Sequence, residues 1–490
     1  MFVRRTRTTA LAALALLNVF TLAAGLVVAR MLPPRLARLH VPVAATRPVV
    51  NATPVLAPAG MLATRVQGTA PTASGLAAML GAALPAGATG PGVGIEVADA
   101  GTGQVLYSAS AGALATPAST TKVVTAVAAL DALGPDARFT TTVRQVGGTV
   151  VLVGGGDPTL AVNEYPSSDY PRPATLAQLA AGTARALKAQ GHHSVRLGYD
   201  TALFSGPDMA QGWTDGLIST GNVTPVVALE ADQGRLTPGG ALEDSDDPLN
   251  FRPRTTDPVG MTVAAFAALL AHDGIKINGP PGETGAPGET AAPASAPVLA
   301  SVSSPPLVEI AEQMLQESNN LIAENMARHV AIALGMPATF TGAASAELTE
   351  LRRLRVTTPI SLVDGSGLSP QDAIAPETLI RVLSLATGTP KLRGAITGLP
   401  VAGFSGTLSA GGSVFGGIGG TAAGAARGVV RAKTGNLATV ATLAGLVYDR
   451  SGDLLVFAIM APQVPDADQL QQAADAIDAA AAGLAHCGCS

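Results

Sequence analysis

Three short polar segments of the sequence carry side chains that could do chemistry. The first contains Ser119 and Lys122, which stand at positions i and i+3 at the start of the apolar run KVVTAVAAL. On a helix these positions share one face, and the unpaired N–H groups of a helix N-terminus favour an anion. Serine is a weak nucleophile until a base takes its proton, and burial can lower the pKa of a lysine enough to make it that base. The pair therefore predicts an activated serine, although a serine at a helix start is also a common cap.

The other two segments supply further polar groups. Ser318 and Asn320 lie in ESNNLIAENMARHV, an otherwise apolar stretch in which polar side chains need partners. Lys433, Thr434 and Gly435 lie near a strand end in RAKTGNLATV, where the glycine leaves room for a ligand backbone. Each segment alone is explained by a polar kink or by a strand-to-turn exit. In this order, however, S-x-x-K, S-x-N and K-T-G form a specific triple, closely similar to that of β-lactamases and penicillin-binding proteins.

The composition excludes several other classes of function. Apolar residues make up 47% of the 490 residues and charged residues only 13%, which supports a sizeable core. The formal net charge is −5 without a long basic run, so nothing attracts nucleic acid electrostatically. Serine–histidine catalysis finds little support, because the sequence has no G-x-S-x-G elbow and no histidine within the three motifs. We expect no metal site and no organic cofactor.

The N-terminus indicates export from the cytoplasm. Three arginines within the first seven residues precede an uncharged stretch from Thr8 to Ala29. As a helix, this stretch spans roughly 33 Å, which is enough to cross the core of a bilayer. Residues 1–30 are therefore a membrane anchor or a cleaved signal peptide, and either places the folded part outside the cytoplasm. The Pro-rich residues 31–71 are expected to form a linker.

Hydrophobic periodicity and turn residues predict an α/β (α+β) protein with an antiparallel sheet flanked by helices. Near the start we expect a helix and then a β-hairpin, and near the end three antiparallel strands and a closing helix. Between them lie further strands, a helix and one long helix that contains the second motif. The expected helices are 73–85, 174–191, 306–334 and 466–484, and the expected strands lie within 92–110, 139–160, 194–204 and 428–460.

The motifs, taken together, make the sequence resemble the class C low-molecular-mass penicillin-binding proteins, which are D-alanyl-D-alanine carboxypeptidases/endopeptidases of peptidase family S13. Five further segments resemble landmarks of that family, in family order: GGGDPTL (154–160), YDTALFSGP (199–207), PVVALEADQGR (225–235), DGSGLS (364–369) and GTLS (406–409). The resemblance covers roughly residues 70 to 485.

The resemblance also implies a domain organisation. It predicts a penicillin-binding-protein/β-lactamase-like transpeptidase domain built from residues 72–138 and 301–486, interrupted by a β-rich inserted domain at 139–300. Ser318 lies 199 positions after Ser119, which leaves room for such an insertion.

The resemblance further implies a mechanism. Ser119 would attack the carbonyl of a D-Ala-D-Ala bond in a peptidoglycan stem peptide, with Lys122 as base and an acyl-enzyme as intermediate. Ser318 would relay a proton to the leaving nitrogen, and Asn320 would hold Lys122 and the peptide amide. β-Lactams would acylate the same serine and leave slowly.

The third motif would bind the substrate. Lys433 and Thr434 would hold its terminal carboxylate beside Gly435, and the N–H groups of Ser119 and Asn436 would form the oxyanion hole. Asp157 and Asp200 are two candidates for reading a free amine on the stem peptide. Two alternatives stay open, a β-lactamase and a catalytically silent cell-wall-binding scaffold.

Overall fold

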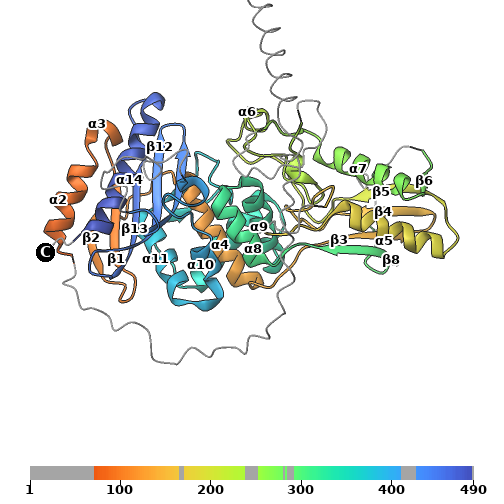
Figure 1. The fold of residues 1–490 in the computed structure, drawn as a ribbon, viewed down its shortest axis with the longest axis horizontal. Coiled ribbons are helices and arrows are strands. Elements are labelled where there is room, and N and C mark those ends of the chain that lie inside the picture. The colour runs from red at the N-terminus through yellow and green to blue at the C-terminus, as the bar shows by residue number, and fades with distance from the viewer. Residues whose placement is uncertain are drawn as a thin grey trace, which may run out of the picture. The chain divides into compact units, whose positions relative to one another are not determined.

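The structure is a computed structural model that describes residues 71–164, 170–237, 252–279, 282–283, 292–409 and 426–487. The expected anchor or signal segment (1–30) and all but the last residue of the expected linker lie outside these residues. No helix among the described residues is long and apolar enough to span a membrane. Residues 65–490 form one compact unit, and its described part contains two large sheets (Figure 1).

The first sheet has five antiparallel strands in the order β11–β12–β13–β1–β2. It confirms the predicted N-terminal hairpin and the three predicted C-terminal strands. Because β1 pairs with β13, the sheet joins the beginning and the end of the folded chain. The strand bounds are β1 Gly94–Asp99, β2 Val105–Ala109, β11 Val430–Leu437, β12 Val440–Tyr448 and β13 Leu454–Ala461.

Helices cover both faces of this sheet (Figure 1). Successive strand residues point to opposite faces, so Leu443 and Phe457 pack against α2 and α14, whereas Ala444 and Ala458 pack against α4 and the helices around it. The helix bounds are α2 Ala73–Ala83, α3 Ala86–Thr89, α4 Thr121–Leu133, α8 Leu307–Glu317, α9 Asn320–Ala333, α10 Phe340–Arg353, α11 Pro376–Gly388, α12 Gly394–Thr397 and α14 Leu470–His486. The predicted antiparallel sheet flanked by helices is confirmed.

The second sheet lies between residues 140 and 303, in the part of the chain where the sequence predicts an insertion. It is mixed, with the order β6–β5–β4–β3–β8 and with β7 beside β5. The strands are β3 Thr140–Val146, β4 Thr149–Val153, β5 Ser194–Asp200, β6 Lys276–Ile277, β7 Gly282–Glu283 and β8 Val298–Ser303. Two helices pack with it, the predicted α5 (Leu176–Ala189) and also α7 (Pro258–His272), which the sequence analysis did not predict.

The predicted single helix over 306–334 is wrong. The structure has two helices, α8 and α9, which are separated at Ser318. Ser318 has the left-handed conformation (φ 57°, ψ 36°), and the side chain of Asn319 caps α9 by accepting from the N–H of Ile322. Short polar side chains favour caps over helix interiors because they bond to the nearby backbone. The run Ser-Asn-Asn therefore starts a new helix instead of lying inside one.

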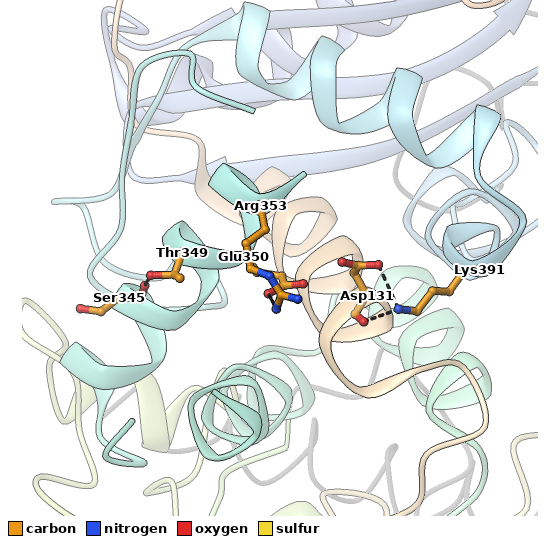
Figure 2. Close-up of polar contacts among 6 residues, drawn as sticks. All are labelled: Asp131, Ser345, Thr349, Glu350, Arg353 and Lys391. Carbon is orange, nitrogen blue, oxygen red and sulfur yellow. Dashed lines mark hydrogen bonds and ion pairs between the residues drawn. The ribbon is translucent and has the colours of Figure 1, made fainter. Parts of the chain in front are cut away.

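Helix α4 is anchored at its C-terminal end, opposite the end that carries the first motif (Figure 2). Lys391 donates to the carbonyl of Asp131 and to its Oδ1 (3.0 Å). Beside them, Arg353 donates to Glu350 of α10 (2.8 Å). All α4 residues from Thr121 to Leu130 are buried, so the helix is a fixed support for its N-terminal residues.

Candidate active site

Ser119 and Lys122 are in direct contact at the N-terminal end of α4. Ser119 lies in a short 3₁₀ turn, Ala118–Thr120, that leads into the helix. The Nζ of Lys122 and the Oγ of Ser119 are hydrogen-bonded at 2.9 Å. The preceding residue, Ala118, has a positive φ of 48°, which is an uncommon and strained conformation for a residue with a side chain. The contact expected from the i, i+3 spacing is therefore present.

The Nζ of Lys122 has two more partners. It donates to the Oδ1 of Asn320 (2.6 Å) and to the carbonyl of Ser366 (2.7 Å). The side chain is fully buried, and this burial lowers the pKa of Lys122 to about 7, although the carboxyl groups of Asp364 and Glu324 act in the opposite direction. Near neutral pH a large fraction of the Lys122 amine is therefore uncharged and able to accept a proton.

A cavity of about 240 Å³ opens in front of Ser119. Residues of all three motifs line it, since its wall also contains Ser318, Asn320, Thr434 and Asn436. Ser318 comes from the break between α8 and α9, and the last two come from β11. The fold thus brings together segments that lie more than three hundred residues apart in the sequence.

The third motif lies along β11, directly beside the segment that carries Ser119. A Cβ atom on Gly435 would lie 2.7 Å from the carbonyl oxygen of Pro117 and 3.0 Å from the nitrogen of Ser119. The sequence analysis expected this glycine to leave room for a ligand backbone. The structure shows that the protein's own atoms take this space, the Oγ1 of Thr442 being nearest, so Gly435 lets β11 approach the turn before α4. Next to it, the hydroxyls of Thr434 and Thr407 are hydrogen-bonded at 2.8 Å.

Lys433 is fully buried behind the cavity wall. Its Nζ donates to the carbonyl of Thr434 (2.9 Å). Burial lowers the pKa of Lys433 well below its usual value, and the charge of Lys122 lowers it further. Since two positive charges in this buried region repel each other, at most one of the two amines is readily protonated without a bound anion.

Several lining residues were not singled out by the sequence analysis. Asn222 comes from the region between the two halves of the first sheet, and Glu317 precedes Ser318 at the end of α8. Helix α14 contributes Ala474, Ile477 and Asp478. None of these residues belongs to one of the three motifs. Their positions at the cavity follow from tertiary packing and not from a local sequence pattern.

The two acidic residues proposed to read an amine have local roles instead. Asp157 accepts from the N–H and the hydroxyl of Thr159, and Asp200 accepts from the N–H groups of Ala202 and Ala292. Neither carboxylate is among the groups that line the cavity. Among the described residues there is also no cluster of His, Cys, Asp and Glu that would hold a metal ion.

Comparison with known proteins identifies the family. The sequence matches the D-Ala-D-Ala carboxypeptidase 3 (S13) family over residues 76–239 and 222–484. The chain belongs to this family. The S13 resemblance expected from the motifs is thereby confirmed.

Two relatives match most of the length of the chain. The chain is 37% identical to carboxypeptidase DacB of Mycolicibacterium smegmatis over 447 residues, which cover 89% of each chain. It is 29% identical to the D-alanyl-D-alanine carboxypeptidase of Actinomadura sp. strain R39 over 421 residues, covering 74% of this chain and 76% of the relative.

A solved structure shows the same fold. Penicillin binding protein 4 (dacB) from Haemophilus influenzae superposes with a TM-score of 0.64 and 23% identity, covering 81% of this chain and 97% of the other. The same protein complexed with a β-lactam superposes with a TM-score of 0.57. The predicted penicillin-binding-protein-like fold is therefore confirmed.

Proposed function

We propose that this protein is a serine-type D-Ala-D-Ala carboxypeptidase/endopeptidase that acts on peptidoglycan stem peptides and is inhibited by β-lactams. Membership of the S13 family supports the reaction class. The observation that carries the proposal for this chain is the buried Lys122 amine, 2.9 Å from the hydroxyl of Ser119, which lines a cavity together with residues of the other two motifs. A base with a pKa near 7 matches the requirement of general-base catalysis at neutral pH.

The first step is acylation of Ser119. Its Oγ attacks the carbonyl carbon of the D-Ala-D-Ala bond while its proton passes to the neutral amine of Lys122. The backbone N–H groups of Ser119 and Asn436, two residues that line the cavity, are proposed to donate to the developing oxyanion. Such donors commonly contribute roughly 3–4 kcal/mol each to transition-state stabilisation.

The second step is departure of the terminal D-alanine. Its nitrogen needs a proton, and Ser318 lies at the cavity wall to relay that proton from Lys122. Asn320 contacts Lys122 and also lines the cavity, so its amide is placed to hold the peptide. The bond between the carbonyl carbon and nitrogen then breaks, D-alanine leaves, and water hydrolyses the acyl-enzyme.

The terminal carboxylate of the substrate is proposed to bind at Thr434, in front of Lys433. In the free protein, burial lowers the pKa of Lys433 and so disfavours its charged form. A bound carboxylate would supply the missing countercharge and so favour the ammonium form of Lys433. That charge would in turn oppose protonation of Lys122. Binding of the carboxylate would thus increase the fraction of Lys122 that is neutral and able to accept a proton.

The proposed location is outside the cytoplasm, where peptidoglycan is found. Residues 1–30 are proposed to act as a membrane anchor or as a cleaved signal peptide. N-terminal sequencing of the protein from membrane and secreted fractions distinguishes the two, because a cleaved protein starts beyond the apolar stretch.

A fluorescent penicillin tests the function. We expect stable labelling of the wild type, loss of labelling in Ser119→Ala, and release of D-alanine from a stem pentapeptide by the wild type only. Rapid turnover of the penicillin would instead favour a β-lactamase. Absence of both labelling and D-alanine release would favour a silent scaffold and would contradict the proposal.

A further inference from the structure

We infer that residues 210–226, named here the bracing segment, position the catalytic base: they fix both groups that orient the amine of Lys122 toward Ser119. The inference rests on the proposed function and extends it to a part of the chain that contains none of the three motifs. The bracing segment lies between β5 and α7, within the region expected to be an insertion.

The orientation of the amine follows from counting hydrogens. A neutral amine has two N–H bonds and one lone pair. The Oδ1 of Asn320 and the carbonyl of Ser366 can only accept, so they take the two N–H bonds of Lys122. The remaining contact, to the Oγ of Ser119, is then left for the lone pair. Two acceptors thus aim the basic electron pair at the hydroxyl that must lose its proton.

The bracing segment fixes the first acceptor through Asn222. The Nδ2 of Asn320 donates to the backbone carbonyl of Asn222 at 2.9 Å. A carbonyl cannot donate, so the amide nitrogen of Asn320 must face Asn222 and its Oδ1 must face Lys122. Without this carbonyl, the amide could turn over and present N–H groups to the lysine.

The bracing segment fixes the second acceptor through Trp213. The Nε1 of Trp213 donates to the Oδ2 of Asp364 at 2.8 Å. The Oδ1 of Asp364 accepts from the N–H groups of Ser366 (3.0 Å) and Gly367 (2.6 Å), and its Oδ2 also accepts from Ser369 N–H (2.7 Å). One carboxylate therefore shapes the turn whose Ser366 carbonyl meets Lys122, and Trp213 ties that carboxylate down.

Apolar packing holds the bracing segment in place. The ring of Trp213 packs edge-on against Phe340 of α10, with centroids 5.4 Å apart and planes at 69°. Val223 and Val226 are buried with Leu321 of α9 in the same small cluster. The segment is therefore seated on α9 and α10, and its two polar contacts have a defined geometry.

The charges around Lys122 predict the direction in which its pKa should move when the indole N–H is removed. The titratable groups facing Lys122 are the carboxyls of Asp364, Glu324 and Asp372, which raise the pKa of Lys122 when they are ionised, and the amine of Lys433, whose positive charge would repel that of Lys122. The indole N–H offsets part of the negative charge of Asp364. Removing this N–H would leave more negative potential at Lys122 and raise the pKa of its amine.

The test uses the fact that Trp213 is the single tryptophan of the chain. Growth of a tryptophan auxotroph on β-(3-benzothienyl)alanine replaces the indole N–H by sulfur at this position alone, with the ring shape retained. Acylation by penicillin, measured as a second-order rate constant from pH 5.5 to 10, reports the fraction of neutral Lys122. We expect the acidic midpoint to move up by about one pH unit, so that the rate falls about fivefold near pH 7 and recovers at pH 10.

A matched control separates the N–H from the ring. Phe340→Leu removes the aromatic partner of Trp213 but leaves the indole N–H, so we expect a lower Tm and an unshifted midpoint. An unshifted midpoint in the benzothienyl protein would overturn the inference, as would an equal shift in Phe340→Leu. If the wild type itself is neither acylated by penicillin nor releases D-alanine, the proposed function fails instead.

A second measurement needs no variant. In wild-type protein labelled with ¹⁵N, the single indole N–H signal belongs to Trp213. We expect this signal to shift with the same pH midpoint as acylation, because the indole contacts the carboxylate that faces Lys122. An indole signal that does not change between pH 5.5 and 9 would also overturn the inference.

Discussion

Three residues next to the catalytic motifs have backbone conformations that side chains rarely adopt. Ala118 precedes the nucleophile, Ser318 is itself a motif residue, and Ala438 follows the third motif; their φ angles are 48°, 57° and 49°. Each such conformation costs about 1–2 kcal/mol in a residue with a Cβ atom. The surrounding structure therefore enforces these turns, as is common where reactive groups must point in a defined direction.

Gly435 gives a prediction at the residue scale. Gly435→Ala would place a Cβ 2.7 Å from the carbonyl of Pro117 and 3.0 Å from the nitrogen of Ser119. Both are backbone atoms, so the turn that carries the nucleophile must shift. Displacements of about 1 Å can cost on the order of 100-fold in rate, and we expect a loss of this size in penicillin acylation.

Gly81→Ala is the matched control for this prediction. Gly81 lies in α2, and a Cβ there would meet no atom within 4 Å. We expect unchanged acylation and a gain in stability of roughly 0.5–1 kcal/mol, because alanine favours helix more than glycine does. Equal acylation rates in Gly435→Ala and Gly81→Ala would contradict the close approach of β11 to Ser119.

Asp372 gives a prediction about pH and stability. Burial, together with the neighbouring carboxyl of Asp364, raises the pKa of Asp372 from its usual value to about 10. Between about pH 4 and pH 10, the folded protein therefore binds this proton and the unfolded chain does not. The contribution of Asp372 to the free energy of unfolding is full below pH 4 and falls as the pH rises.

Asp372→Asn removes this titration. An asparagine resembles the protonated acid, so we expect the variant to lose about 1.4 kcal/mol less stability than the wild type for each pH unit between pH 5 and pH 9. Urea unfolding at several pH values measures the difference. Parallel stability curves for the two proteins would show that Asp372 titrates alike in the folded and unfolded states.

At the scale of elements, α4 must hold Ser119 and Lys122 while it packs in the middle of the core. Its C-terminal end is tied to the 3₁₀ turn Pro390–Leu392 by Lys391 (Figure 2). The carboxyl groups of Asp131 and Glu350 are also close, and burial together with the hydrogen bond that protonated Glu350 donates to Asp131 raises the pKa of Glu350. This polar cluster lies at the opposite end of α4 from the serine, so its role is to fix the helix.

Lys391→Met tests that role. The side chain is 44% exposed, and exposed ion pairs contribute at most about 1 kcal/mol, to which the contact with the Asp131 carbonyl adds a little. We expect a loss of about 1 kcal/mol in the free energy of unfolding. The acylation rate should be unchanged under conditions in which the variant is fully folded. A tenfold fall in acylation with unchanged stability would mean that this end of α4 also affects the site.

At the scale of the whole molecule, buried polar contacts join the part that carries the second sheet to α9. Asn319 donates to the Oε1 of Gln233 (2.7 Å), Asn325 donates to Glu230 (3.2 Å), and the imidazole of His329 meets the carbonyl of Gly156 (3.0 Å). Such groups are costly to leave unpaired in the interior. The two parts should therefore separate only when the whole unit unfolds.

This predicts one cooperative unfolding transition. Trp213 fluorescence reports the packing between the bracing segment and α10, whereas far-UV circular dichroism reports all helices. We expect the two probes to give the same Tm within about 2 °C. A fluorescence transition well below the circular dichroism transition would show that the region between residues 140 and 303 unfolds on its own.

Local patterns in the sequence predicted much of the fold. Alternating apolar residues and tight turns located β1, β2 and the three strands from Val430 to Ala461. Pattern reasoning failed at Ser318, because an apolar periodicity continues across the break and the capping by Asn319 does not interrupt it. It also missed α7, whose run PVGMTVAAFAALLAH is apolar on nearly every side and has little periodicity.

The sequence by itself was enough to predict the type of chemistry, because residue types and the order of the motifs can be read without knowledge of the fold. A serine three residues before a lysine, followed by S-x-N and K-T-G, predicted a nucleophile and its base and also indicated the family, which the family match confirms. The proximity of Ser119 to Lys122 also follows from helix geometry alone.

Only the tertiary structure decided the protonation and the orientation of the Lys122 amine. The pKa of Lys122 depends on its complete burial, and the direction of its lone pair depends on Asn320 and Ser366, which are fixed by Asn222 and Trp213. Desolvation and hydrogen-bond direction arise from atoms that are distant in the chain and close in space. Neither desolvation nor hydrogen-bond direction can be predicted from the periodicity or the spacing of residues in the sequence.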